Sequence, residues 1–431
     1  MHLSQYLKIF PIADGRRHLF YSTRSGALAV VGDTDLTALK QGDFSLEVVA
    51  GLRALGMVVD DLDTERRQVL SMVDEINGQV STLFLDIILG MDCNFRCIYC
   101  YEGAMKGKHG MSETTAGQLV EFVSGLLAGG KEGLSATFYG GEPLLYGHRL
   151  KSLAAAMQTV ASQQGAFFEF SLITNGSLLK PKLVKELLPF GLKAAKVTLD
   201  GPPDIHNASR PFASGQPSFA TIIDNVCSCA ELLTIHIGAN FSAGNHHRYG
   251  ELIELLTNAG LGPATVGQLR FAPVMEQQED VGEGGFRQGC ATMNEAWLAQ
   301  TQVALRDKAM TAGYAVPEQN IGPCKVLRDD HLTIHYDGTL CKCPVLIGRS
   351  DYVIGDIWQG VGDMSSYFPD NWRRNKGCRR CSYLPLCFGG CRYLALIRDG
   401  HMKNVDCLQG LLDATLEHFV RQDGRYCHGV E

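Results

Sequence analysis

Short apolar runs alternate with longer amphipathic stretches between residue 83 and about residue 312. The apolar runs predict strands at 83–89, 135–139, 167–174, 194–199, 234–240 and 268–273. Apolar positions spaced three and four residues apart predict helices at 113–127, 149–162, 182–188, 219–232, 247–259 and 294–312. Ser112 is a suitable N-cap for the first of these helices, which places Leu119, Phe122, Val123, Leu126 and Leu127 on one face.

Six successive strand–helix units imply a parallel sheet. They fall short of the eight units that close a barrel. We therefore predict an α/β fold, a partial (β/α)6 barrel that stays open. In such folds the active site lies at the carboxyl ends of the strands.

Polar or glycine-rich segments follow the first four predicted strands. They are Cys93–Cys100, Gly140-Gly141-Glu142-Pro143, Thr174-Asn175-Gly176 and Asp200-Gly201-Pro202, in strand order. One such turn often does no more than end a strand. Four of them at one rim of the barrel predict a binding site there.

Three further segments flank the predicted barrel of residues 81–312. Residues 1–80 suggest strands in the stretches 6–12 and 18–31, with turns at Asp14-Gly15 and Ser25-Gly26. Helices near 35–41 and 45–55 and a short strand at 57–59 follow. This order resembles a small winged-helix unit, and a packing extension is the alternative. Residues 313–410 are rich in cysteine and poor in periodic runs, which is typical of a metal-held domain. Residues 411–431 begin as a helix and end in a polar tail.

The first cysteine cluster consists of Cys93, Cys97 and Cys100. Three thiolates at this spacing can hold three irons of a cubane iron–sulfur cluster, which usually takes four cysteine ligands. The fourth iron would keep an open coordination position, where metal sites do chemistry. A structural zinc site is the alternative, but among Cys and His only His109 follows nearby.

A second array of seven cysteines lies near the C-terminus. Cys324 precedes Gly338 by thirteen intervening residues, and Cys343 follows after four more. Next come four cysteines spaced C-x2-C-x5-C-x3-C and then a single one, namely Cys378, Cys381, Cys387, Cys391 and Cys407. This order indicates metal ligation, with one or two zinc knuckles as the alternative.

Composition limits the remaining function classes. The chain has 431 residues, a net charge of -7 and 15 cysteines. A negative charge argues against a nucleic-acid partner, which would call for a basic surface. We find no signal peptide and no apolar run of membrane-spanning length, so we expect a cytoplasmic protein without a membrane partner. In that reducing compartment the cysteines are expected to bind metal rather than to form disulfides.

These motifs together resemble the radical S-adenosylmethionine (SAM) superfamily. Cys93-x3-Cys97-x2-Cys100, with Tyr99 before the last cysteine, looks like its cluster motif, and Gly140–Pro143 looks like its methionine-binding segment. The array from Cys324 to Cys407 is similar to the seven-cysteine SPASM extension, which holds auxiliary clusters. The whole layout is most similar to the geopeptide-type radical SAM/SPASM peptide maturases.

The resemblance implies three [4Fe–4S] clusters and SAM as cofactors. Cys93, Cys97 and Cys100 would be the catalytic cluster ligands. The remaining cofactor contacts would come from Tyr99, Gly140, Gly141, Glu142, Pro143, Thr174, Asn175 and Thr198. An outer auxiliary cluster would be held by Cys378, Cys381, Cys387 and Cys407, and an inner one by Cys324, Cys343 and Cys391. Cys341 or Cys290 would complete the inner cluster, or one of its irons would stay open to a substrate thiolate.

The implied reaction is reductive cleavage of SAM to a 5′-deoxyadenosyl radical, followed by oxidative modification of a ribosomally synthesised precursor peptide. Cross-linking is the expected outcome, and a thioether is one product. The N-terminal unit would hold the peptide, and a low-potential donor such as ferredoxin or flavodoxin would supply the electron. The alternatives are side-chain oxidation of the sulfatase-maturing type, an iron–sulfur electron carrier and a zinc-stabilised binding module. Pro344 and Asn207 replace aspartates of the sulfatase-maturing pattern and weaken that alternative.

Overall fold

The computed structural model describes residues 1–12, 15–42, 46–107, 109–276, 289–319 and 321–427. The chain divides into two compact units, and each is described by itself. The barrel unit comprises Val80–Pro317 and Asp329–Tyr367. The flanking unit comprises Met1–Gln79, Glu318–Arg328 and Phe368–Glu431.

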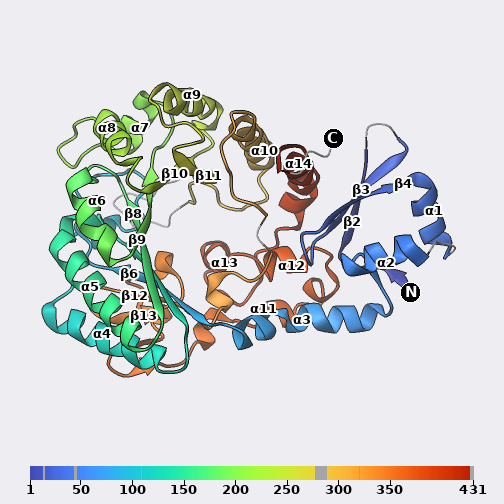
Figure 1. Cartoon of the computed structure of the whole chain (residues 1–431), viewed down its shortest axis with the longest axis horizontal. Helices are drawn as coiled ribbons and strands as arrows, with labels where there is room; N and C mark the ends of the chain where they lie inside the picture. The colour runs from blue at the N-terminus through green and yellow to red at the C-terminus, as the bar shows by residue number, and fades with distance from the viewer. Residues whose placement is uncertain (13–14, 43–45, 108, 277–288, 320, 428–431) are drawn as a thin grey trace. The chain divides into compact units, whose positions relative to one another are not determined.

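Six parallel strands form most of the barrel unit's sheet, which confirms the predicted α/β partial barrel (Figure 1). They are β6 (Thr82–Ile88), β7 (Gly133–Tyr139), β8 (Phe167–Thr174), β9 (Leu192–Thr198), β10 (Thr234–Phe241) and β11 (Val266–Pro273). Between and after them run α4 (Glu113–Leu127), α5 (Gly147–Gln163), α6 (Pro181–Leu187), α7 (Pro203–Ser209), α8 (Phe219–Cys229), α9 (Gly250–Asn258) and α10 (Ala296–Thr311). The Ser112 side chain caps α4 by accepting the Thr115 N–H, as predicted.

Four short strands extend this sheet beyond β6, and the sequence did not predict them. They are β12 (His331–Ile334), β13 (Thr339–Cys341), β14 (Gly355–Asp356) and β15 (Gly360–Val361). β12 pairs with β6 in parallel, and the other three follow in antiparallel order. Strands of two to four residues are too short to show a periodic pattern.

The two faces of the sheet differ because side chains alternate along each strand. Leu85 and Ile87 of β6 share the buried outer face with Phe138 of β7, and α4, α5 and α6 lie along that side (Figure 1). Ile88 pairs with Tyr139 on the inner face, and the register of β12 continues this row to His335. The carboxyl-terminal rim thus carries inner-face side chains from three neighbouring strands.

The N-terminal part of the flanking unit is a three-stranded antiparallel sheet with helices. The sheet contains β2 (Leu7–Pro11), β3 (Arg17–Ser22) and β4 (Leu28–Gly32), while β1 (His2–Leu3) pairs with β5 (Val58–Val59). The helices are α1 (Asp33–Gln41), α2 (Leu46–Ala54) and α3 (Leu62–Gly78). The chain turns at Gly26 with a φ of 73°, as predicted, so the stretch 18–31 falls into two strands.

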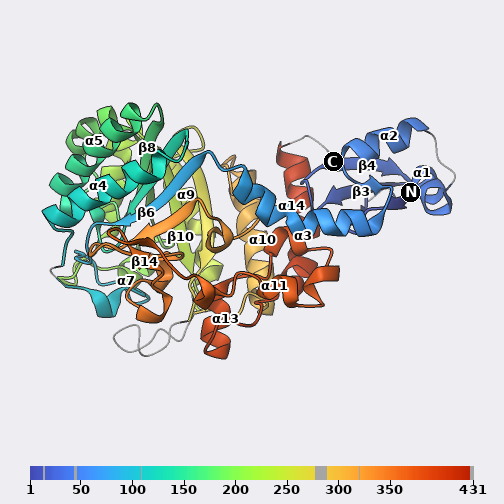
Figure 2. The ribbon, with the colours of Figure 1, turned by 90° about the horizontal axis from the view of Figure 1, so that it is seen from below.

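C-terminal residues complete the core of the flanking unit. Its short helices are α11 (Asn371–Arg374), α12 (Leu384–Cys387) and α13 (Arg392–Asp399), followed by the long α14 (Gln409–Cys427). Leu19 and Tyr21 of β3 pack with Leu412 and Leu416 of α14 (Figure 2). Residues 1–79 therefore share a core with the C-terminal helix. The boundaries of the two units differ from those of the four segments predicted from the sequence. No helix in the described part of the chain is long and apolar enough to cross a membrane.

Candidate active site

The first cysteine cluster lies on a loop that follows β6 and is fixed along its length. Backbone hydrogen bonds run from Arg96 N to Pro211 O (2.9 Å) and from Ile98 N to Ser209 O (3.0 Å). Phe95 is buried and meets the Phe212 ring edge-on, with ring centroids 4.9 Å apart. The loop therefore has a defined shape that orients its three thiols.

The three thiols lie close enough for their charges to interact. Burial raises the pKa of Cys93 to about 11 and that of Cys100 to about 12, and the negative charge of Cys97 adds to both increases. The Lys106 ammonium opposes both shifts and donates a hydrogen bond to Phe95 O at 2.8 Å. Thiols this strongly buried lose their protons when a metal supplies positive charge. A set of three sulfur donors fits an iron–sulfur cluster.

No three Cys, His, Asp or Glu side chains in the described ranges converge to hold a single metal ion. The ligands of a cubane cluster need not converge in this way, because each binds a different iron. The arrangement of Cys93, Cys97 and Cys100 is therefore compatible with the larger group.

The Gly140-Gly141-Glu142-Pro143 turn follows β7 and packs against the start of the cysteine loop. Gly140 and Gly141 have φ values of 86° and 38°, a region that favours glycine. A Cβ on Gly141 would lie 2.2 Å from Asp92 O, and Glu142 N donates to that same oxygen at 2.8 Å. The turn therefore presents bare backbone beside the thiols.

The Glu142 carboxylate ties neighbouring strand ends together. It is fully buried and accepts hydrogen bonds from Thr174 Oγ1 (2.7 Å), Asn175 N (2.7 Å) and Leu144 N (3.0 Å). Burial raises its pKa, and these donors oppose the shift. Asn175 Nδ2 also donates to Asn94 Oδ1 (2.8 Å) in the cysteine loop. These side chains hold the rim together, and their contact with a cofactor stays a prediction.

A buried polar network surrounds Tyr99. Its hydroxyl donates a short hydrogen bond to Asp200 and accepts one from Arg210 Nη1 at 2.8 Å. Asp200 also accepts the Asn240 N–H at 2.7 Å. Burial lowers the pKa of His206 to about 3, so the neutral ring accepts the Asp200 N–H at Nδ1. Asp200 and Arg210 therefore fix the Tyr99 side chain, and with it this part of the cysteine loop.

Thr198, the remaining predicted contact, ends β9 beside Gly238 and is half-buried. Its part in cofactor binding stays a prediction.

The sequence did not single out Glu102, which is 5% exposed. Its Oε2 accepts the Gly141 N–H at 2.9 Å, and Oε1 has no hydrogen-bond partner among the described residues. Burial raises the pKa of Glu102 to about 7, opposed by the Gly141 hydrogen bond and by the positive charges of Lys106 and His335. Its position two residues after Cys100 was the only available signal.

His335 and Tyr139 also lie at this rim and were missed. His335 Nδ1 is 3.0 Å from Asp337 Oδ1, and Nε2 has no partner in the described part of the chain. Burial raises the pKa of Tyr139 strongly, and the charges of Cys100 and Asp86 add to the shift. These residues come from separate strands, and only the register of the sheet brings them together.

A family model described as the radical SAM superfamily matches residues 87–242. The chain contains a radical SAM domain. The match includes the cysteine loop, the Gly140–Pro143 turn and Tyr99 with its partners, and the family implies SAM and a [4Fe–4S] cluster as cofactors.

Curated relatives of this chain include the serine-type anaerobic sulfatase-maturating enzyme of Klebsiella aerogenes. It is 22% identical over 76% of this chain and 83% of its own length. The cysteine-type enzyme of Clostridium perfringens is 19% identical over 70% and 86%.

Solved structures share the fold. Native anSMEcpe with bound AdoMet and a Kp18Cys peptide matches with a TM-score of 0.63 at 16% identity, over 81% of this chain and 99% of that one. Streptococcus suis SuiB matches with a TM-score of 0.57 at 14% identity, over 94% and 99%. SuiB bound to the precursor peptide SuiA gives a TM-score of 0.54.

Four of the later cysteines lie in the flanking unit, close enough for their charges to interact. Burial raises the pKa of Cys378 to about 11 and that of Cys387 to about 12, and the charges of Cys381 and Cys407 add to both shifts. The four predicted ligands of the outer cluster are thus within electrostatic reach of one another, and their role as ligands stays a prediction.

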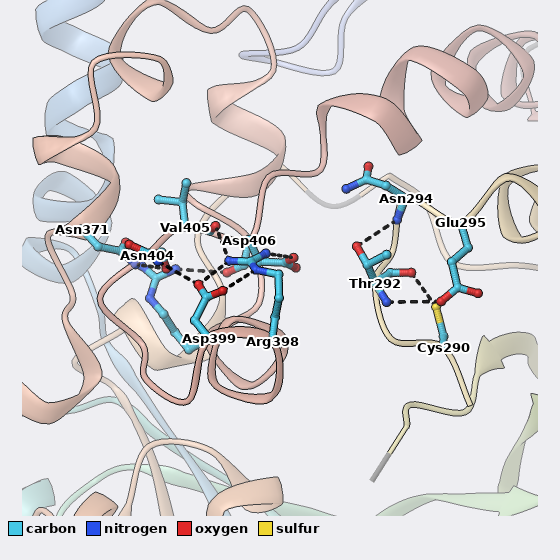
Figure 3. Close-up of polar contacts among 12 residues, drawn as sticks. Cys290, Thr292, Asn294, Glu295, Asn371, Arg398, Asp399, Asn404, Val405 and Asp406 are labelled. Atoms are coloured by element: carbon cyan, nitrogen blue, oxygen red, sulfur yellow. Dashed lines mark hydrogen bonds and ion pairs between the residues drawn. The ribbon is translucent and has the colours of Figure 1, made fainter. Parts of the chain in front are cut away.

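Hydrogen bonds hold the segment before Cys407 in place. Asn371 Nδ2 donates to Asn404 O at 3.0 Å, and Arg398 Nη2 donates to Val405 O at 3.1 Å (Figure 3). Arg398 also forms an ion pair with Asp406 at 3.4 Å (Figure 3). Cys407 is therefore presented from a braced loop.

The predicted ligands of the inner cluster fall in both units. Cys324 and Cys391 belong to the flanking unit. Burial raises the pKa of Cys391, and the charge of Cys324 adds to this shift. Cys343 belongs to the barrel unit. Their joint role as ligands stays a prediction.

Proposed function

We propose that this radical SAM enzyme oxidatively cross-links a ribosomally synthesised precursor peptide. The feature that carries the proposal is a free strand edge beside an apolar groove in the flanking unit. The likeness to SuiB, which has been solved with a precursor peptide, supports it. A thioether is one candidate product.

The barrel unit would bind the catalytic cofactors. Cys93, Cys97 and Cys100 would hold the [4Fe–4S] cluster, which with bound SAM supplies a 5′-deoxyadenosyl radical able to remove a hydrogen atom from substrate. The backbone of Gly140 and Gly141 would receive the methionine part of SAM. The chain's own work is to bind, orient and exclude water.

Glu102 would accept the ammonium group of SAM. Its carboxylate lies near both the cysteine loop and the Gly140–Pro143 turn. Its charge raises the pKa of Cys100, and its Oε2 accepts the Gly141 N–H. The unpartnered Oε1 is a buried acceptor that a cationic donor would satisfy.

The leader part of the peptide would add a strand to β4. This strand pairs only with β3, so its other edge is free in the described sheet. Ser22 N donates to Ala27 O (3.0 Å), and Asp33 N donates to Arg16 O (2.8 Å). Successive residues of a strand point their N–H groups to opposite edges. The N–H groups of Leu28 and Val30 therefore point to the free edge of β4. Main-chain hydrogen bonds of this kind give affinity to added strands.

An apolar groove of about 420 Å³ lies along the same strand. It is lined by Leu19, Gly26, Ala27, Leu28, Ala29, Val30 and Gly424. The Val30 side chain is 41% exposed and could receive an apolar side chain of the added strand. The helix α14 forms part of the groove's wall through Gly424.

Two auxiliary clusters would serve the oxidation. Cys378, Cys381, Cys387 and Cys407 would hold the outer one, and Cys324, Cys343 and Cys391 the inner one. For the inner cluster's fourth ligand, the surroundings favour Cys341 over Cys290. Burial raises the pKa of Tyr367, and the charges of both Cys341 and Cys343 add to it, so these thiols share one environment.

Cys290 is engaged elsewhere. It is fully buried, and its thiol donates a hydrogen bond to Thr292 O at 2.6 Å (Figure 3). An open iron that binds a substrate thiolate remains the alternative to Cys341. A low-potential donor such as ferredoxin or flavodoxin would reduce the catalytic cluster.

The relationship to sulfatase-maturating enzymes supports a second candidate, oxidation of a protein side chain. The residues argue against it. Asn207 caps α8 by accepting the Ser218 and Phe219 N–H groups, both at 2.9 Å, so it has a structural task. Pro344 has no carboxylate that could take up a proton.

Peptide binding tests the proposal directly. The substitution Val30→Pro removes an edge N–H without breaking the β3–β4 ladder, and Val30→Thr keeps both the N–H and the branched shape. With a fluorescent peptide from the neighbouring open reading frame, we expect Val30→Pro to abolish the anisotropy change and Val30→Thr to retain it. Equal binding by both variants would refute docking at β4. Deleting residues 1–79 is a poorer test because it would expose the core shared with α14.

A further inference from the structure

We infer that Arg392 is a counter-charge shared by the two auxiliary clusters and that it raises the reduction potential of both. The inference rests on the auxiliary clusters of the proposed function. Arg392 is 2% exposed and is the first residue of α13. It lies within the flanking unit, as do the thiols considered with it.

The guanidinium lies within electrostatic reach of cysteines of both predicted clusters. Burial lowers the pKa of Arg392, and the charges of four thiols oppose this shift. Cys324 and Cys391 are predicted ligands of the inner cluster, while Cys378 and Cys387 are predicted ligands of the outer one. The charge of this one side chain therefore interacts with ligands of both predicted clusters.

Most of the hydrogen-bonding capacity of Arg392 is unused. Nη1 donates to Gly390 O at 3.1 Å, but Nε and Nη2 have no partner among the described residues. Burying a cation without a partner is costly. The buried Asp406 carboxylate is one nearby anion, because the charge of Arg392 opposes the rise in its pKa that burial causes. Cluster sulfides and thiolates would supply the missing acceptors and further negative charge.

The location on the helix makes the case stronger. A helix N-terminus carries a partial positive charge, so a cation there is unfavourable unless anions lie nearby. The backbone N–H groups of Tyr393 and Leu394 lower the pKa of Cys391, which shows that this terminus faces its thiol. The helix terminus and its backbone donors therefore face the Cys391 thiol, and the guanidinium lies near the same sulfur.

A nearby cation stabilises the reduced, more negative state of a cluster. Net charge and hydrogen bonds to the sulfurs are among the factors that set cluster potentials. Removing the guanidinium should therefore make both auxiliary clusters harder to reduce. Lysine would keep the charge but offer fewer donors, so its effect should be smaller and in the same direction.

Redox titration followed by electron paramagnetic resonance tests the inference. The parent protein carries Cys93→Ala, Cys97→Ala and Cys100→Ala, so only auxiliary clusters contribute. Arg392→Gln should lower both midpoint potentials, and Arg392→Lys should lower them less. The control Arg53→Gln, on α2 with its side chain 51% exposed, should leave them unchanged. Unchanged potentials in the Arg392 variants would overturn the inference, as would a shift of one cluster alone.

If the Arg392→Gln protein does not hold its auxiliary clusters, Arg392→Lys is the test. Lower midpoint potentials of both clusters would support the inference, and unchanged potentials would overturn it. A parent protein without any [4Fe–4S] signal would instead refute the auxiliary clusters, and the role of Arg392 would fall with them. The two failures are therefore distinguishable.

Discussion

Replacing Glu102 with glutamine should weaken SAM binding while leaving the fold intact. The Gln amide oxygen can still accept the Gly141 N–H, which Glu102 Oε2 accepts at 2.9 Å. The position of Oε1, which has no partner in the described structure, would become an uncharged NH2 group. That group cannot accept a hydrogen bond from an ammonium.

The size of the effect follows from the contact that is lost. A buried hydrogen bond to a charged group contributes about 1.5–3 kcal/mol. Since about 1.4 kcal/mol changes an affinity tenfold, the Kd for SAM should rise roughly 10- to 150-fold. 5′-Methylthioadenosine lacks the ammonium, so its affinity should not change.

Anaerobic calorimetric titration of the reconstituted enzyme measures both affinities. Glu113→Gln is the matched control, because this carboxylate lies on α4 with its side chain 82% exposed. Equal weakening of both ligands by Glu102→Gln would mean that the residue only supports the loop. Unchanged affinity for SAM would refute the ammonium contact. A wild-type protein that binds no SAM would instead refute the cofactor assignment.

Further predictions follow from the same site. Gly141→Ala should reduce the bound iron and the Tm, because its Cβ would lie 2.2 Å from Asp92 O, whereas Gly125→Ala, with nothing within 4 Å, should be tolerated. Iron analysis and thermal melts distinguish the two, and a normal Gly141→Ala protein would contradict the close packing. Tyr99→Phe should lower the free energy of unfolding by about 1–3 kcal/mol, because the buried Asp200 loses a hydrogen-bond donor. Urea titration measures this free energy, and an unchanged value would show that the network contributes little to stability. Removing iron with a chelator should lower the Tm, since metal binding and folding are coupled, and an unchanged Tm would argue against clusters that hold the cysteine loops.

The sequence predicted the barrel well because its elements are long and periodic. The strand at 167–174 and the helix at 113–127 match β8 and α4 residue for residue. Helix ends were less certain: α10 begins at Ala296 rather than at 294 because Glu295 is its N-cap. The helix predicted at 219–232 ends at Cys229. Terminal turns lack enough periodicity to fix such boundaries.

The candidate site could be predicted only where spacing carries the signal. Cysteine spacing and the Gly-Gly-Glu-Pro turn identified the cluster loop and its neighbour. Glu102, Arg210 and Arg392 were missed because Glu and Arg are usually exposed, and only the fold shows that these are buried. His335 was missed because it follows β12, a strand of only four residues that shows no periodic pattern. β12 lies beside β6 only through a pairing between segments far apart in the sequence.

The most direct test of the central claim is a mass measurement on the peptide encoded by the neighbouring open reading frame. The reconstituted enzyme would be incubated anaerobically with SAM, a reductant and this peptide. We predict 5′-deoxyadenosine together with a peptide that has lost two hydrogens, and a blocked cysteine if the bond is a thioether. Formation of 5′-deoxyadenosine with the peptide mass unchanged would contradict the peptide-maturase account, and the absence of 5′-deoxyadenosine would contradict radical chemistry at Cys93, Cys97 and Cys100.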